Sequence, residues 1–365
     1  MIKFSCEKVF LQNAIAVTSR AVAQKSSIPA LEGLLIHADQ QLTISGYNMQ
    51  TGIRTNVFAN VVEGGDIVLN ARLFGDIIRR MPDDMITFTA DEKMMVHVSC
   101  GDADFDILGL SAADYPDLPE VEDEYAVSMQ QKVLRSMIEE VAFAVSTNES
   151  RPVHTGALFE IADMSLSMVA VDGFRLAFRR EKLEKLEGGA FSFVCPGSAL
   201  SEVKSICGDT EDLVTVTLGK RHILFEIGDT QLICRRLEGE FLDYKNAIPR
   251  KNPIQIVAET KALIESIDRV SVVISDKLKS PVRCLFDHDK TGNGEAKDVC
   301  RVSGDGDKLE IGFNNRYLME ALRYAPADKV KIELNTGVSP AIIVPVEGEE
   351  NFLYMVLPVR LKSAE

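Results

Sequence analysis

The stretch VLRSMIEEVAFAVS, residues 133–146, decides the fold because two other stretches of the chain repeat its pattern. FLQNAIAVTS (10–19) stands near the start, and ALIESIDRVSVVIS (262–275) stands in the last third. Each predicts a helix with an apolar stripe, followed by a serine. The leucines of the three copies are spaced by 123 and 129 residues. Self-similarity at such a period predicts three copies of one structural unit.

A second helix, with a strand behind it, also recurs three times. The copies are ARLFGDIIRRMPDDMITFT (71–89), GSALSEVKSICGDTEDLVTVT (197–217) and NRYLMEALRYAPADKVKIEL (315–334). In each copy a turn containing Pro or Gly ends the helix, and an alternating apolar and polar run follows. Each unit then closes with an irregular tail. The tails are FDILGLSAADYPDLP (105–119), LICRRLEGEFLDYKNAIP (232–249) and FLYMVLPVRL (352–361).

Alternation in the remaining strands predicts antiparallel sheets. Residues 85–100 and 213–237 alternate apolar and polar side chains, with hairpin turns at Asp91-Glu92, Gly219-Lys220 and Gly228-Asp229. Alternation is typical of a sheet with one buried face, which amphipathic helices can cover. We therefore predict an α+β fold. Its predicted domains are residues 1–122, 123–250 and 251–365.

Composition excludes several classes of protein. No run of apolar residues is long enough to span a membrane, and the first residues lack a signal-peptide core. Seven scattered cysteines without a CxxC pair argue against a disulfide framework or zinc site, so we expect a cytoplasmic protein. The chain has no GxxxxGK[ST], GxSxG or HExxH motif, and its five histidines show no ligand spacing. We expect neither an enzyme nor a cofactor or metal.

The six repeated helices differ in charge from the rest of the chain. The whole chain carries −15, whereas segments 7–20, 71–81, 129–144, 197–207, 259–274 and 314–324 together carry +3. Homologous units often close into symmetric rings. Two chains would supply twelve such helices, and at about 10 Å each they would surround a hole of roughly 25–30 Å. That hole would admit a nucleic-acid duplex. Ordinary solvation of helix faces is the alternative explanation of the same charges.

The chain resembles the bacterial sliding clamp, the β subunit of DNA polymerase III, over its whole length. The pieces that carry the resemblance, in order, are KFSCEKVFLQNAI (3–15), SSIPALEGLLI (26–36), LSAADYPDLP (110–119), VAVDGFRLAF (169–178), EGEFLDYKNAIP (238–249), IGFNNRYLMEAL (311–322) and YMVLPVRL (354–361). The resemblance implies three DNA-clamp domains whose helices line the inside of a ring of antiparallel sheets. It implies a homodimeric ring that encircles duplex DNA without sequence preference, holds the polymerase and performs no catalysis. The implied partners are the DNA polymerase III α subunit, the clamp loader and other proteins with a clamp-binding motif.

The resemblance also implies a groove for partner peptides between the second and third domains. The matching positions are His154, Val171, Gly173, Phe174, Arg175, Leu176, Leu242, Asn246, Asn314, Tyr317, Val338, Pro340, Met355, Val356, Leu357, Pro358, Val359 and Arg360. Aliphatic and aromatic walls with a few polar groups suit a peptide. The family often has Thr, Pro and Arg at the positions of Val171, Leu242 and Asn246, so the preferred peptide can differ. Residues 362–365 follow the usual end of the family and could lie beside the groove.

For DNA, the resemblance matches Lys25 to a basic loop residue and Asn148 and Arg151 to a loop that touches the duplex. Pro152 and Val153 replace a pair of aromatic residues often found beside that loop. The helices add further candidate DNA-facing cations, which are Arg20, Arg72, Arg79, Arg80, Lys132, Arg135, Lys204, Lys261, Arg316 and Arg323. Contacts to phosphates predict weak, salt-dependent binding. At the dimer interface, the resemblance sets Phe105 and Ile107 against Val273 and Ile274.

The third unit departs most from the pattern. Its first and second helices are separated by 40 residues, against 51 and 53 in the other units, which predicts a shortened hairpin. The segment DHDKTGNGEAKD (287–298) imitates a calcium loop, but its flanks are not helical and its last ligand is Asp, so we interpret it as a polar turn. An acidic interaction scaffold that never meets DNA is the alternative function. A hydrolase with an unrecognised carboxylate site is a weaker one.

Overall fold

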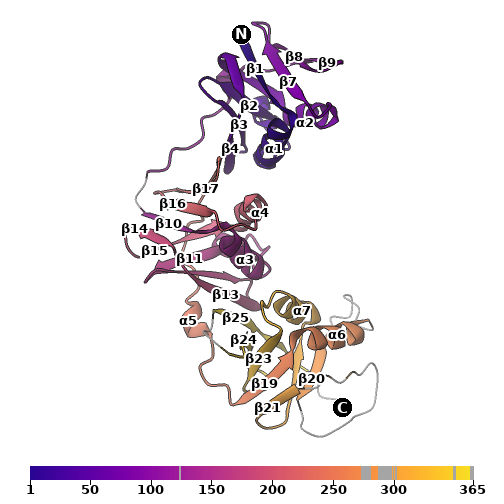
Figure 1. Cartoon of the computed structure of the whole chain (residues 1–365). Coiled ribbons are helices and arrows are strands. Elements are labelled where there is room, and N and C mark those ends of the chain that lie inside the picture. The colour runs from indigo at the N-terminus through magenta and orange to yellow at the C-terminus, as the bar shows by residue number, and fades with distance from the viewer. Residues whose placement is uncertain are drawn as a thin grey trace. The chain divides into compact units, whose positions relative to one another are not determined.

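The computed structural model describes residues 1–122, 125–272, 281–286, 298, 300, 302–347 and 351–361 (Figure 1). These residues form two compact units. Unit 1 comprises Met1–Leu134, Glu184–Gly189 and Glu202–Arg236, and unit 2 comprises Arg135–Leu183, Ala190–Ser201 and Leu237–Glu365. No helix among the described residues has the length and apolar character that crossing a membrane requires.

The predicted helices are all present. They are α1 (Lys8–Thr18), α2 (Ala71–Arg80), α3 (Gln131–Ala142), α4 (Gly197–Ile206), α6 (Thr260–Ser271) and α7 (Asn315–Arg323). A short helix, α5 (Tyr244–Ala247), lies in the second closing tail. Short 3-10 turns are η1 (Ser19–Ala21), η2 (Pro29–Glu32), η3 (Ala112–Asp114) and η4 (Pro152–Thr155).

Local sequence explains where α2 begins and ends. The side chain of Asn70 accepts a hydrogen bond from the backbone nitrogen of Leu73 at 3.0 Å, which caps the first turn. Phe74, Ile77 and Ile78 are buried, so the helix presents one apolar stripe to the core. The helix stops at Met81 because Pro82 disfavours helical backbone in the residue before it.

Unit 1 contains a nine-stranded antiparallel sheet that joins strands of the first and second repeats. Its order is β14-β10-β16-β17-β18-β4-β3-β2-β6. The strands are β14 (Lys185–Glu187), β10 (Tyr125–Gln130), β16 (Leu213–Leu218), β17 (His222–Ile227), β18 (Thr230–Arg235), β4 (Thr51–Val57), β3 (Leu42–Tyr47), β2 (Gly33–Ala38) and β6 (Gly65–Asn70). The predicted hairpins after β16 and β17 are confirmed.

Unit 2 contains a second nine-stranded sheet, ordered β15-β11-β12-β13-β25-β24-β23-β19-β21. The strands are β15 (Phe191–Pro196), β11 (Gly156–Ala162), β12 (Ser165–Val171), β13 (Arg175–Lys182), β25 (Phe352–Val356), β24 (Ala341–Pro345), β23 (Lys329–Leu334), β19 (Ile254–Glu259) and β21 (Val302–Asp305). Read from β6 to β14, the first sheet places equivalent strands of the repeats in this same order, so the two sheets share one design.

Each unit also carries a smaller sheet. In unit 1 the order is β5-β1-β7-β8-β9, with β5 (Asn60–Glu63), β1 (Ile2–Glu7), β7 (Met85–Ala90), β8 (Met95–Cys100) and β9 (Ala103–Leu108). In unit 2 the order is β20-β22-β26, with β20 (Val282–Phe286), β22 (Leu309–Phe313) and β26 (Pro358–Val359). Strands β7 and β8 alternate buried and less buried residues, as the sequence predicts.

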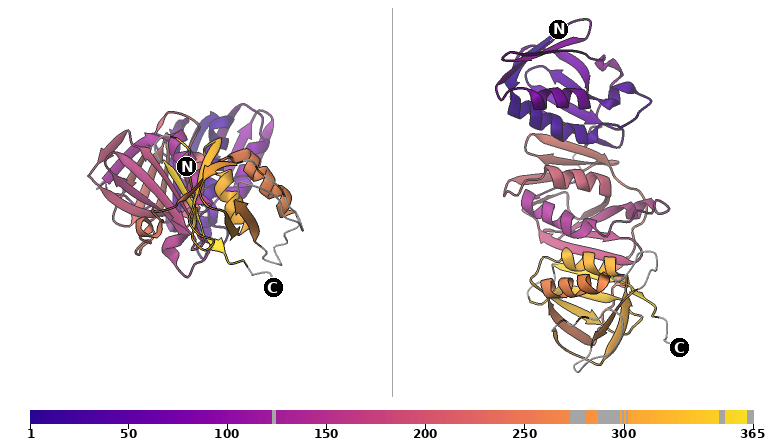
Figure 2. Two further views of the ribbon diagram at one scale, coloured as in Figure 1. Left: turned by 90° about the horizontal axis from the view of Figure 1, so that it is seen from below. Right: turned by 90° about the vertical axis from the view of Figure 1, so that its right-hand side faces the viewer.

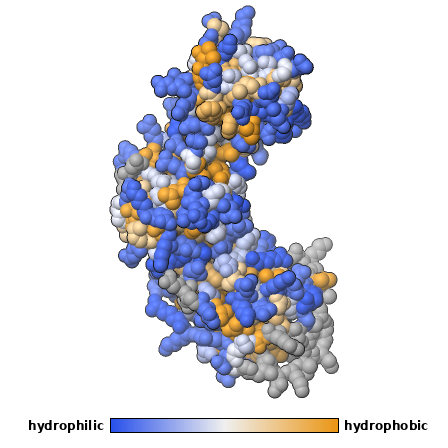
Figure 3. All heavy atoms as spheres, viewed as in Figure 1, coloured by the Kyte–Doolittle hydropathy of each residue, from blue (hydrophilic) through white to orange (hydrophobic). Residues whose placement is uncertain are grey.

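Helices and sheets enclose the cores. In unit 1, apolar residues of α1 and α2 pack with those of β1, β2, β3, β6, β7 and β8 in one cluster. Helices α1 and α2 lie side by side, as do α6 and α7 in unit 2 (Figure 2). Hydrophilic residues dominate the face seen in Figure 3, with scattered apolar side chains between them.

The predicted α+β fold is confirmed. The shortened hairpin and the calcium-like segment fall mainly outside the described residues.

Candidate functional site

A groove of about 510 Å³ opens in unit 2, where β12, β13 and β25 meet the second closing tail. Its lining residues are Ser146, Asn148, Ser150, Arg151, His154, Val171, Asp172, Gly173, Phe174, Arg175, Leu176, Leu242, Ala247, Pro340, Met355 and Leu357. A concave, mostly apolar surface of this size is typical of a ligand or peptide site.

The groove has a buried apolar floor and an exposed apolar rim. Val171, Leu176 and Met355 are buried and belong to one hydrophobic cluster with Tyr244. On the rim, by contrast, the side chains of Phe174 and Leu242 are 57% and 44% exposed. An apolar side chain that is exposed to water beside a buried apolar floor favours binding, because a partner that covers it removes apolar surface from water.

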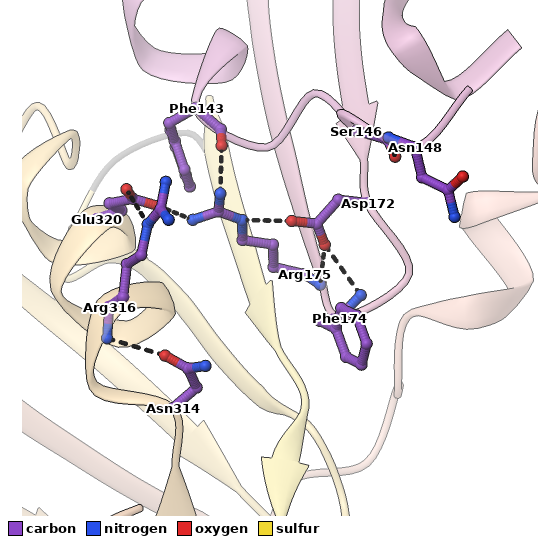
Figure 4. A network of polar contacts seen from close by, with 9 residues as sticks. All are labelled: Phe143, Ser146, Asn148, Asp172, Phe174, Arg175, Asn314, Arg316 and Glu320. Atoms are coloured by element: carbon purple, nitrogen blue, oxygen red, sulfur yellow. Dashed lines mark hydrogen bonds and ion pairs between the residues drawn. The ribbon is translucent and has the colours of Figure 1, made fainter. Parts of the chain in front are cut away.

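The turn between β12 and β13 positions Phe174 (Figure 4). Gly173 has a φ of 88°, a left-handed conformation that favours glycine. The Oδ1 atom of Asp172 accepts hydrogen bonds from the backbone nitrogens of Phe174 at 2.9 Å and Arg175 at 3.1 Å. The Phe174 ring stacks on Tyr317, with 5.8 Å between ring centroids. Hydrogen bonds to Asp172 therefore hold the backbone of the turn, and the Tyr317 ring supports the Phe174 side chain.

Arg175 connects this turn to α7. Its Nε donates to Asp172 at 2.8 Å, and Nη2 donates to the carbonyl of Phe143 at 2.6 Å. Nη1 forms an ion pair with Glu320, and the guanidinium carbon lies 4.6 Å from the centre of the Tyr317 ring. The three nitrogens of this buried guanidinium and its flat face thus all have partners. A charged group that is removed from water needs such partners, because burying it unpaired is costly.

Glu320 holds its charge in this network. Burial acts to raise its pKa, but hydrogen bonds from Arg175 and Arg316 outweigh burial, so the pKa is lowered. The Nε of Arg316 lies 3.0 Å from Glu320. The side chain of Asn314 caps α7 by accepting from the backbone nitrogen of Arg316 at 3.0 Å.

The loop before β11 forms the opposite wall. The backbone carbonyl of His154 accepts from the nitrogen of Ser146 at 2.9 Å, and the imidazole ring lies edge-on to Phe241 at 5.4 Å. Burial, and secondarily the nearby charge of Arg151, lower the pKa of His154 below its ordinary value of 6.5. At neutral pH the ring is therefore uncharged and suits an apolar groove.

The groove gathers many of the positions that the resemblance assigned to it. The lining includes His154, Val171, Gly173, Phe174, Arg175, Leu176, Leu242, Pro340, Met355 and Leu357. Tyr317 and Asn314 support the groove from α7, and Asn246 lies on α5 beside Ala247. Val356 is fully buried in β25, and Pro358 and Val359 form β26 against β22. Val338 is exposed in the loop before Pro340, and Arg360 is exposed after β26.

Other lining residues were missed or assigned elsewhere by the sequence. Ser146, Ser150, Asp172 and Ala247 line the groove without having been predicted there. Asp172 had a signal, since Asp followed by Gly between two apolar runs is typical of a tight turn. Asn148 and Arg151, which the resemblance assigns to a loop touching DNA, also line the groove.

Ion pairs divide the candidate DNA-facing cations into two groups. Arg20 pairs with Glu202 at 3.0 Å and Lys132 with Glu211 at 2.7 Å. Arg79 and Arg80 both pair with Asp76, Arg316 with Glu320 and Arg323 with Asp268. Among described residues, the side chains without such an ion pair include those of Lys25, Arg72, Arg151, Lys204 and Lys261. Arg135 is exposed on α3.

The small sheet of unit 1 carries two of the four predicted dimer residues at a free edge. Phe105 and Ile107 lie on β9, the last strand of its sheet, and Phe105 is 40% exposed. Val273 and Ile274 lie outside the described residues. The order β9-β8-β7-β1-β5 repeats β18-β17-β16-β10-β14, and β20-β22 repeats β2-β6. Among the described residues, the two small sheets thus hold seven of the nine strand positions of that design, and the positions of β3 and β4 have no equivalent in them.

Comparison with known proteins accounts for the whole chain. Family models match residues 2–119, 128–243 and 245–360, and describe the N-terminal, central and C-terminal domains of the DNA polymerase III beta subunit. Curated proteins named "Beta sliding clamp" are similar throughout. The one from Synechocystis is 31% identical, covering 99% of this chain and 100% of the relative; the one from Bacillus subtilis is 26% identical, covering 98% and 100%.

A solved structure agrees with these relatives. The beta subunit from the DNA polymerase of Streptococcus pyogenes superposes with a TM-score of 0.92 at 27% identity, covering 99% of this chain and 100% of the other. The repeat, the two sheets of common design and the matched domains lead to one assignment. The chain belongs to the DNA polymerase III beta subunit family, the beta sliding clamps.

Proposed function

We propose that two copies of this chain close into a ring around duplex DNA and hold DNA polymerase III on its template. The observation that carries the ring is the complementarity of the small sheets. One lacks the β2, β3, β4 and β6 positions of the nine-stranded design, and the other supplies strands equivalent to β2 and β6. The free edge of β9 leaves backbone donors and acceptors unpaired, and in the nine-stranded design the strand equivalent to β4 would stand there, so this edge is where a second copy would pair.

The ring would hold DNA through its helices. The cations Lys25, Arg72, Lys204 and Lys261 have no ion pair with a described residue and can approach phosphates directly. Such contacts read no base edge, so binding is independent of sequence and weakens steeply with salt. Weak contacts let an enclosed duplex slide.

The groove in unit 2 would receive short peptides from partner proteins. We propose the DNA polymerase III α subunit, the clamp loader and other proteins with a clamp-binding motif as its ligands. The rim residues Phe174 and Leu242 and the neutral ring of His154 favour apolar peptide side chains. Leu242 and Val171 stand where family members often have Pro and Thr, so the peptide preference of this chain would differ.

The three repeats would be clamp domains at residues 1–122, 123–250 and 251–365, in keeping with the matched ranges. Polymerase or exonuclease activity would belong to partner subunits. The seven cysteines of this chain, all among the described residues, form no disulfide bond with one another, which suits a reducing cytoplasm.

Topological retention on DNA tests the proposal. The protein, loaded by a clamp loader, is followed on closed circular DNA and on the same DNA cut once. We expect it to remain on circles and to slide from the ends of linear DNA. Equal loss from both substrates would contradict encirclement and favour an acidic scaffold.

A further inference from the structure

A second hollow in unit 2, of about 710 Å³, lies across α5 from the groove and has no role in the proposed function. We call it the outer hollow. Its lining residues are Glu160, Ile161, Ala162, Asp163, Ser165, Ser167, Phe178, Arg180, Ala190, Phe191, Ser192, Tyr244, Lys245, Ile248, Arg250 and Leu353. Leu242 and Ala247 line the groove, whereas Tyr244 and Lys245, from the same segment, line the outer hollow.

The strand pattern builds a surface with two kinds of side chain. Phe178 and Arg180 are two residues apart on β13, so their side chains point to the same face of the sheet. Phe178, Phe191, Ile248 and Leu353 are partly buried, and each keeps apolar surface open to solvent. The hollow therefore combines an apolar base with cations beside it.

Two of these cations are available to a ligand. Lys245 is 3.1 Å from Glu160, which also accepts from the hydroxyl of Tyr244, so those charges are satisfied within the chain. Arg180 and Arg250 are exposed and form no ion pair with a described residue. Asp163 is the other charged lining residue. The uncompensated charge of the hollow is thus positive, in a chain whose net charge is −15.

The equivalent surface of unit 1 shows that this character does not follow from the fold. A hollow of about 640 Å³ lies on the corresponding strands there, and Thr43 corresponds to Ser167 because Leu42 aligns with Leu166. Its charged lining residues are Arg54, Asp66, Asp117, Glu226 and Asp229, together with His37. Carboxylates are the most numerous charged groups in the hollow of unit 1. In the outer hollow, arginines and a lysine are the most numerous, although the strand order of the two sheets is the same.

We propose that the outer hollow binds an acidic polypeptide segment that carries apolar side chains. Carboxylates of the segment would pair with Arg180 and Arg250, and its apolar side chains would cover Phe178, Ile248 and Leu353. Arginine favours such pairing because its planar guanidinium binds a carboxylate through two hydrogen bonds. Nucleic acid fits less well, since apolar surface forms the base of the hollow and a phosphate backbone would leave that surface uncovered. The position across α5 would let one partner occupy the groove and the outer hollow together.

The test uses a short fluorescent peptide in which Glu alternates with Leu and Phe, and a matched peptide with Lys in place of Glu. The double variant Arg180→Glu/Arg250→Glu should weaken binding of the acidic peptide by about tenfold or more. Lys93→Glu, an exposed charge reversal in unit 1, should leave binding unchanged. The lysine peptide should bind the parent poorly and should gain affinity in the double variant, whose hollow carries carboxylates in place of the two arginines. Circular dichroism checks that each variant is folded.

Leu242→Asp separates this proposal from the proposed function. It should weaken a groove peptide and leave the acidic peptide bound, so the two sites can fail independently. The inference is overturned if the acidic peptide binds the double variant and the parent equally, or if both peptides bind alike. It is also overturned if duplex DNA or anionic lipid vesicles, and not the acidic peptide, lose affinity in the double variant.

Discussion

The Nε atom of Arg175 lies 2.8 Å from Oδ2 of Asp172, while the other oxygen of that carboxylate accepts from the backbone of Phe174 and Arg175. One aspartate therefore shapes the turn that carries Phe174 and holds the arginine that reaches α7. The rim of the groove and the helix are parts of one polar network.

Asp172→Ala should weaken peptide binding at the groove. The substitution removes hydrogen bonds to a charged group, each worth about 1.5–3 kcal/mol, so we expect at least a roughly tenfold rise in Kd for a polymerase-derived peptide. Isothermal titration calorimetry measures this Kd. Asp102→Ala, an exposed aspartate in unit 1, is the control and should have no effect. Equal affinity for both variants would contradict the role of the turn.

Leu242→Asp should nearly abolish binding of the same peptide. It places a charge on the apolar rim, where a bound peptide would bury it without a partner. Leu213→Asp, at a leucine that is 51% exposed outside the groove, is the matched control. Fluorescence anisotropy with a labelled peptide distinguishes the two. Retained affinity in Leu242→Asp would place the peptide elsewhere.

His154 should make the groove sensitive to acid. Because its folded pKa is lowered, protons bind the unfolded chain more readily, and the free energy of unfolding falls as pH drops below about 6.5. Peptide affinity should fall in the same window, and His154→Gln should flatten its pH profile. His222, whose pKa is lowered by burial and by Arg235 and Arg221, is the control. His222→Gln should leave the pH profile of peptide binding unchanged.

Unpaired cations should contribute more to DNA binding than paired ones. The double variant Lys25→Ala/Arg72→Ala should lower affinity for DNA and reduce the salt slope by about one for each lost phosphate contact. Arg20→Ala/Lys132→Ala removes the same charge from residues already held by carboxylates. Its effect should be smaller in filter-binding assays at several salt concentrations. A larger loss of DNA affinity in Arg20→Ala/Lys132→Ala than in Lys25→Ala/Arg72→Ala would contradict the division into paired and unpaired cations.

Phe105→Asp should convert a dimer into a monomer. The residue is exposed on the free edge of β9, where a buried carboxylate would oppose sheet pairing with a second copy. Phe58→Asp, at a phenylalanine that is 85% exposed, introduces the same charge away from that edge. Analytical ultracentrifugation reports the mass. A dimer that survives Phe105→Asp would place the interface elsewhere.

The sequence was most informative where physical signals were local and repeated. The stripe of Phe74, Ile77 and Ile78, the capping Asn70 and the following Pro82 define α2 almost alone. The alternation in β7 and β8 likewise predicts a hairpin. For the groove, however, residues and spacing were insufficient, and the resemblance supplied most of the positions. Asp172 forms its bonds within the turn, to Phe174 and Arg175, but the contacts of Arg175 with Phe143 and Glu320 join segments far apart in the sequence and could not be predicted from it.

The sequence by itself determined the three repeats, their helices and strands, and the charge difference between helices and chain, because these depend on neighbours along the chain. Tertiary structure decided how strands of different repeats share one sheet, as in the pairing of Arg175 with Val356. It also decided which cations are neutralised, since Arg20 and Glu202 are far apart in sequence and 3.0 Å apart in space. Contacts between distant segments leave no periodic trace in a sequence, and the site is built from them.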